Sequence, residues 1–151
     1  MATNINLYDV FRQKQSGGNG AVNLTSVPVK MMIVSAGYVP NQNTNAFRDS
    51  LGANEVVGAG YATGGNLLST VTVVLSALGV VTVDANDPAS WVQTAGGFTN
   101  GRRIVIYAAR GGAATADELI AYSDDFGADI GNAAATLTLT LNALGIFTSG
   151  R

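Results

Sequence analysis

Residues 71–84 have the sequence Val-Thr-Val-Val-Leu-Ser-Ala-Leu-Gly-Val-Val-Thr-Val-Asp, two valine-rich runs on either side of Ser76-Ala77-Leu78-Gly79. β-Branched side chains are favoured in strands, where they pack well on a pleated surface. A short connection that contains glycine is typical of a hairpin. We therefore predict strands over Val71–Leu75 and Val80–Asp84. A helix over Thr70–Leu78 is the competing interpretation, and the density of valine and threonine argues against it.

Strand-like patterns recur outward from this hairpin. Residues 136–141 alternate strictly between threonine and leucine, which predicts a strand with one apolar and one polar face. Asn100-Gly101 is a turn signal ahead of another strand. Strands are predicted at Val27–Ser35, Trp91–Ala95, Arg102–Ala109, Thr115–Ser123 and Thr136–Leu141. A helix start is the alternative within Thr115–Ser123, and one or two helical turns are expected at Thr44–Leu51.

About seven to eight short strands separated by turns predict an all-β fold, a single β-sandwich or jelly-roll-like domain. Ahead of it, Leu7, Tyr8 and Phe11 precede the glycine-rich stretch Ser16–Gly20. Because glycine frees the backbone, we interpret residues 1–20 as an extended N-terminal arm and hinge, and residues 21–151 as the β-sandwich domain. The alternative is a first strand of the same domain followed by a loop. An arm has no core of its own, so Leu7, Tyr8 and Phe11 are candidate partner contacts.

The residue inventory excludes several kinds of chemistry. There are no cysteines and no histidines, which rules out disulfides, catalytic triads with histidine and His/Cys zinc sites. Glu55 and Glu118 are the only glutamates, and nothing pairs two carboxylates across a cleft as a glycosidase requires. The glycines of residues 58–65 lack the lysine and serine of a phosphate-binding loop. We expect no enzyme, no cofactor and no metal, with the aspartates of 84–87 and 124–129 interpreted as turn residues rather than calcium ligands.

Charge and hydropathy limit the partners. The net charge is -2 with eight Lys and Arg, too little positive charge for nucleic-acid binding, which depends on phosphate neutralisation. The densest basic spot, Arg102-Arg103, is a candidate partner contact or a pair of solvated arginines. No signal peptide is recognisable, and the longest apolar stretch, Val71–Val83, is too short for a membrane span. Charged residues are only 12% of the chain, against roughly 25% in an average domain. Such a surface suits extended protein contact, although a soluble monomer with a neutral polar coat fits equally well.

Eight segments follow one another in a recognisable order: Val29–Ile33, Tyr38–Thr44, Ala53–Val56, Gly58–Gly65, the hairpin Val71–Asp84, Asp87–Trp91, Phe126–Asp129 and Thr136–Leu141. This order resembles that of a family of small tailed-bacteriophage proteins. Asn43 and Asn45 stand where the family pattern has Asp and His. The resemblance covers the chain from about Val27 onward and transfers no catalytic residue.

The resemblance implies a virion structural protein, of the head decoration or cement kind, on the capsid surface of a particle assembled in the host cytoplasm. Its partners would be the major capsid protein and further copies of itself, with a trimer at three-fold sites as one arrangement. Two alternatives remain. One is a head–tail connector or tail component. The other is a carbohydrate- or host-binding module, for which Tyr38, Tyr61 and Trp91 are the available aromatic set, although Trp91 is first expected in the core.

Overall fold

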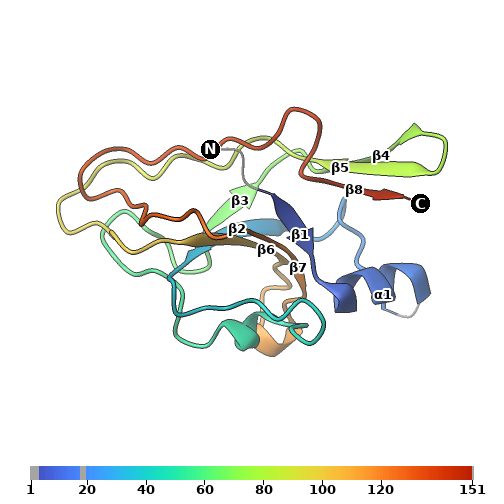
Figure 1. The fold of residues 1–151 in the computed structure, drawn as a ribbon, viewed down its shortest axis with the longest axis horizontal. Coiled ribbons are helices and arrows are strands. Elements are labelled where there is room, and N and C mark those ends of the chain that lie inside the picture. The colour runs from blue at the N-terminus through green and yellow to red at the C-terminus, as the bar shows by residue number, and fades with distance from the viewer. Residues whose placement is uncertain (1–3, 18–19, 151) are drawn as a thin grey trace.

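The computed structural model describes residues 4–17 and 20–150. Over these residues the chain is mostly β, with eight strands in two antiparallel sheets, one α-helix and two short 3-10 turns (Figure 1). The elements are β1 (Ile5–Leu7), α1 (Asp9–Gly17), β2 (Val29–Val34), η1 (Arg48–Leu51), β3 (Asn66–Leu68), β4 (Thr72–Ala77), β5 (Val80–Asp84), β6 (Arg103–Ala108), η2 (Ala114–Ala116), β7 (Leu119–Ser123) and β8 (Phe147–Gly150). The predicted all-β, sandwich-like class is confirmed, although the two sheets remain open over the described part of the chain.

The larger sheet has the strand order β1-β7-β6-β2-β3 and holds most of the core. Its central pair is β2 and β6, which run antiparallel with Val29 opposite Ala108 and Val34 opposite Arg103. Both strands are buried along almost their whole length, as expected for continuous apolar runs covered on both faces. The strands predicted from Val27–Ser35, Arg102–Ala109 and Thr115–Ser123 are therefore confirmed as β2, β6 and β7.

The smaller sheet has the order β4-β5-β8 and contains the predicted hairpin. The connection is tighter than expected, because β4 continues to Ala77 and only Leu78 and Gly79 turn the chain. Gly79 adopts a positive φ of 77°, which glycine accepts without steric cost. The register shifts between Leu75 and Ala77, so Ser76 forms a bulge in β4. Figure 1 shows the hairpin and β8 extending beyond the larger sheet.

The N-terminal residues belong to the fold and are not an arm. Ile5–Leu7 form β1, which pairs antiparallel with β7, and α1 follows directly. Tyr8 is fully buried and Phe11 is 4% exposed. The ring of Phe11 meets Phe147 edge-on, with centroids 6.3 Å apart. These apolar side chains are thus the anchor of the segment to the core, which corrects the arm interpretation; the proposed hinge includes Gly18 and Asn19, which lie outside the described residues.

The two strands predicted at Trp91–Ala95 and Thr136–Leu141 are absent as strands. The segments run side by side (Figure 1), but only Trp91 and Leu137 exchange backbone hydrogen bonds, each 2.9 Å long. Side chains hold other backbone groups of this ribbon: Gln93 N donates to Thr136 Oγ1 at 3.0 Å, and Leu141 N donates to Asp87 Oδ1 at 2.6 Å. The leucines are half-buried and the threonines exposed, so the alternation correctly predicts the faces and wrongly predicts a ladder. The last strand is instead β8.

Candidate interaction surface

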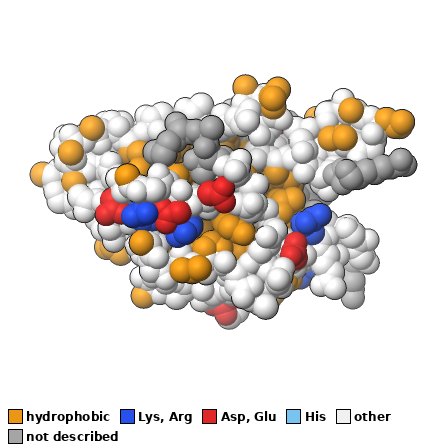
Figure 2. All heavy atoms as spheres, in the orientation of Figure 1, with side chains coloured by type: hydrophobic (Ala, Val, Ile, Leu, Met, Phe, Trp, Pro, Cys, Tyr) orange, Lys and Arg blue, Asp and Glu red, His pale blue; other side chains and the backbone are white. Residues whose placement is uncertain are grey.

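The β4–β5 hairpin presents apolar side chains to solvent. Every residue of β4 is exposed, including Val73 at 44%, Val74 at 55% and Leu75 at 69%, and Leu78 at the turn is 100% exposed. Figure 2 shows hydrophobic side chains, without charged ones among them, at this end of the molecule. Large apolar patches on a protein surface mark sites of protein contact.

The hairpin lacks most of the features that normally protect a sheet edge. Natural edge strands are blunted by lysine, proline or inward-pointing charges. Residues 67–83 contain no charged residue and no proline. A β-bulge can also protect an edge, and β4 has one at Ser76, near its C-terminal end. Among the described residues, no strand pairs with β4 on the side away from β5.

The backbone orientation of β4 follows from the neighbouring strands. The carbonyl of Val83 accepts a hydrogen bond from the backbone N–H of Ile146 at 2.8 Å, so Val83 directs its backbone groups toward β8. Because direction alternates along a strand, Thr82 and Asp84 face β4, opposite Val74 and Thr72. The intervening residues of β4, Val73 and Leu75, therefore direct their N–H and C=O groups toward the free edge.

The candidate arginines form ion pairs within the chain. Arg102 Nη2 lies 2.7 Å from Asp125 Oδ1, and Arg103 Nη2 lies 3.1 Å from Asp125 Oδ2. Hydrogen bonds from the backbone N–H of Gly127 and from Arg102 lower the pKa of Asp125. Arg103 Nη1 also donates to the carbonyl of Tyr38 at 3.1 Å. These contacts join the start of β6 to the loop after β7, and a partner-contact role for the two arginines stays a prediction.

Tyr38 contacts both Arg103 and Tyr8, one of the partner-contact candidates of the N-terminal segment. Its hydroxyl lies 2.7 Å from that of Tyr8 and donates to Asn45 Oδ1 at 3.0 Å. Burial and the hydrogen bond with Tyr38 raise the pKa of Tyr8. Both rings are buried, so Tyr8 is a core residue in this structure, as is Phe11, while Leu7 is half-buried.

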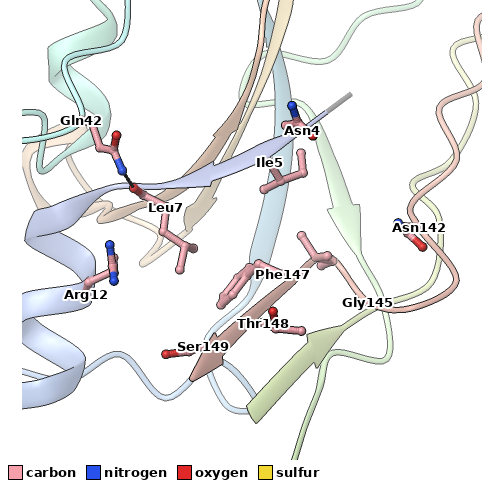
Figure 3. Close-up of a pocket in the computed structure, with 11 residues that line it drawn as sticks. Asn4, Ile5, Leu7, Arg12, Gln42, Asn142, Gly145, Phe147, Thr148 and Ser149 are labelled. Atoms are coloured by element: carbon pink, nitrogen blue, oxygen red, sulfur yellow. Dashed lines mark hydrogen bonds between the residues drawn. The ribbon is translucent and has the colours of Figure 1, made fainter. Parts of the chain in front are cut away.

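Leu7 lines a groove of about 460 Å³ between β1 and β8 (Figure 3). Gln42 Nε2 donates to the Leu7 carbonyl at 2.9 Å along one side, and Phe147 and Ser149 of β8 form the other. A second hollow of about 570 Å³ lies under the leucines of residues 137–141. Among the described residues, Arg12 is the only ionisable side chain that lines the first hollow, and none lines the second.

A second ion-pair network, which sequence analysis did not find, lies near the end of β6. Arg48 Nε lies 2.8 Å from Asp117 Oδ2, and Arg110 holds Glu118 through two hydrogen bonds of 2.8 and 2.9 Å. Lys14 of α1 lies 3.9 Å from Glu118. Burial acts to raise the pKa of Glu118, but the hydrogen bonds and charge of Arg110 outweigh it, so the pKa lies below its usual value. The network joins α1, η1 and Arg110 to Asp117 and Glu118, the two residues that precede β7.

The glycine-rich and aspartate-rich segments considered for ligand binding make contacts within the chain. Gly65 adopts a φ of 71°, and a Cβ there would overlap the carbonyl of Met31. Asp124 accepts hydrogen bonds from the side chains of Asn4 and Asn6 at 3.1 and 2.7 Å. Over residues 4–17 and 20–150, no group of three or more Asp or Glu could share a metal ion. Within the same residues, no helix is long and apolar enough to cross a membrane.

Comparison with protein families, curated proteins and solved structures finds no match for this chain. The functional assignment therefore rests on the sequence and on the surface described above. The aromatic set considered for sugar binding gives no support, because Trp91 and Tyr38 are buried and Tyr61 is half-buried against Trp91.

Proposed function

We propose that this chain is a structural, non-catalytic component of a tailed-bacteriophage particle. It would act as a head decoration or cement protein that binds the major capsid protein and further copies of itself. The observation that carries a binding role is the apolar hairpin, which is uncharged up to Asp84 at the end of β5 and whose exposed β4 edge suits contact with other protein chains. The particle itself is suggested by the order of segments that resembles small tailed-phage proteins, from Val29–Ile33 to Thr136–Leu141.

A decoration protein does not need one tight interface. Several weak contacts made at once on a repeating lattice raise the overall affinity well above that of each contact. A surface with few charges lowers the desolvation cost of such contacts. The compact attachment of β1 and α1 to the core means that the described N-terminal residues would contribute a rigid surface rather than an arm that orders on a neighbour.

The proposal includes location and partners. The protein would reside on the capsid surface after synthesis in the host cytoplasm, without binding nucleic acid or membrane. Its small positive charge, eight Lys and Arg in the whole chain, supports the absence of a nucleic-acid role.

Stoichiometry in purified particles tests the proposal. We expect a copy number close to that of the major shell protein, as quantified by mass spectrometry against labelled standards. A copy number typical of a single ring would refute decoration and favour a connector or tail component. Absence from the particle would refute any virion role.

Particle binding by variants tests the hairpin directly. Particles lacking this protein would be incubated with the unaltered protein, with Val74→Lys, or with Val57→Lys as the matched control. Val57 is 85% exposed and lies outside the hairpin. We expect Val74→Lys to bind more weakly and Val57→Lys to bind as the unaltered protein does. Equal binding by all three proteins would show that the hairpin is not part of the interface.

A further inference from the structure

The self-complementary part of the hairpin edge is the segment Thr72-Val73-Val74-Leu75-Ser76. Three apolar side chains lie in its middle and one hydroxyl side chain lies at each end. The order of side-chain types is therefore the same in both directions about Val74. An antiparallel pairing of two such segments would match apolar with apolar over Val73–Leu75, and the bulge at Ser76 would lie at the end of the paired stretch.

We infer that β4 pairs antiparallel with β4 of a second copy of this chain, about a two-fold axis at Val74. In this register Val73 lies opposite Leu75 of the second copy, and Val74 lies opposite its own counterpart. A two-fold interface of this kind is isologous and closes on itself, so it forms a dimer rather than a fibre. The two three-stranded sheets would become one six-stranded sheet.

The backbone of β4 supports this register. Val73 and Leu75 direct their N–H and C=O groups toward the free edge, since Val74 faces Thr82 of β5. Opposed Val73 and Leu75 residues would exchange backbone hydrogen bonds with each other on both sides of the axis. The opposed Val74 pair would be the non-hydrogen-bonded pair, in which side chains approach most closely.

Charge and exposure favour a second copy as the partner. Residues 67–83 carry no charge, and the one charged residue of the hairpin, Asp84, ends β5 and does not lie on β4. Two β4 edges therefore meet without like charges facing each other. Val73, Val74 and Leu75 remain 44–69% exposed in the single chain, which leaves apolar surface for a partner strand to cover. A short edge pairing is smaller than a standard interface of about 800 Å² per partner, so the dimer should dissociate reversibly on dilution.

Sedimentation equilibrium of the isolated protein over a wide concentration range tests the pairing. We expect the unaltered protein to shift from monomer to dimer as concentration rises. Val74→Lys and Val74→Glu each place like charges directly opposite one another, which should raise the dissociation constant by roughly tenfold or more. Val57→Lys, on an exposed valine outside the hairpin, should dimerise as the unaltered protein does.

Mixing the variants tests the two-fold register. An equimolar mixture of Val74→Lys and Val74→Glu should recover dimer, because each lysine then faces a glutamate. A mixture of Val73→Lys and Leu75→Glu should also recover dimer, because the lysine of one copy then faces the glutamate of the other on the opposite face of the strand. This second mixture replaces the first if a Val74 variant fails to fold. Mixtures that stay monomeric overturn the register.

The remaining outcomes separate this inference from the particle assignment. A protein that is monomeric at all concentrations, or trimeric, overturns β4 self-pairing. If it is monomeric and Val74→Lys still loses particle binding, the shell protein occupies the edge, and the particle assignment survives. If it dimerises as described but is absent from particles, the self-pairing stands and the particle assignment fails.

Discussion

Phe11→Ala tests whether the N-terminal segment is part of the core. Phe11 is 4% exposed on α1 and packs edge-on against Phe147 of β8. It therefore bridges the start of the chain to its last strand, across the whole length of the sequence. An arm that docks only on a partner would leave this side chain without an effect on the stability of the single chain.

The expected loss follows from the burial of the ring. Phe-to-Ala changes in cores cost about 3–5 kcal/mol, of which an edge-on aromatic pair accounts for about 0.5–1.5 kcal/mol. We expect about 3 kcal/mol, the lower end, because α1 is short and lies beside the sheets, where neighbours can relax into the space. That is a large share of the 5–15 kcal/mol typical of a folded domain.

Urea unfolding followed by tryptophan fluorescence measures the loss. Trp91 is the single tryptophan and is 2% exposed, so its emission reports on the core. With a urea dependence of about 2 kcal/mol per molar, the midpoint should fall by about 1.5 M. Val57→Ala, at an 85% exposed position, is the control and should change stability by less than about 0.5 kcal/mol.

A Phe11→Ala midpoint as close to the unaltered value as that of Val57→Ala would refute the assignment of α1 to the core. Phe11→Leu covers the case in which the alanine variant does not fold. It keeps most of the volume and should cost roughly 0.5–1.5 kcal/mol. No measurable cost for the leucine variant would count against the packing described here.

Three further predictions concern charge, a buried donor and a glycine. The lowered pKa of Glu118 means that its ion pair stabilises the fold above the unfolded pKa of about 4.3. This contribution is lost as pH falls through the folded pKa, so Glu118→Gln should flatten the acid branch of a pH–stability curve more than Asp9→Asn does. Trp91 Nε1 is buried without a hydrogen-bond partner in the described structure. Trp91→Phe should therefore cost about 1 kcal/mol or less in thermal unfolding followed by circular dichroism, because losing the unpaired donor offsets part of the lost packing. Gly65→Ala should cost about 2 kcal/mol or more, since the new methyl overlaps the β2 backbone; Gly96→Ala, at a φ of 76° but in open space, should cost only about 1 kcal/mol of backbone strain.

Residue types correctly predict the strands that pair with a neighbouring strand along most of their length. The valine-rich runs around Gly79 pair with each other, and the apolar run of β2 pairs with β6 and β3, so each lies in an antiparallel ladder. In both cases the residue types and the pairing agree. Residue type alone could not show that β4 would be left exposed, because exposure depends on which strand lies beside it.

The clearest alternation in the chain shows the limit of such predictions. Residues 136–141 keep their leucines half-buried and their threonines exposed, but their neighbour contains Pro88 and offers only Trp91 for regular pairing. Periodicity specifies which face of a segment is buried, whereas a ladder also needs a neighbouring backbone in register. For the same reason β8, with its mixed Phe-Thr-Ser-Gly sequence, was missed although it pairs with β5.

The N-terminal segment and the hairpin show that burial of an apolar side chain depends on which strands lie beside it. Tyr8 and Phe11 were assigned to an interface because a glycine-rich stretch follows them, yet pairing of β1 with β7 brings them onto the core. The apolar residues of β4 are the reverse case, since they belong to a well-formed strand whose outer edge meets no other strand of the described chain. The protein therefore leaves this uncovered apolar surface on a strand that pairing with β5 already holds extended. Because an ordered strand loses little conformational entropy on pairing, this is where a partner strand gains most from binding.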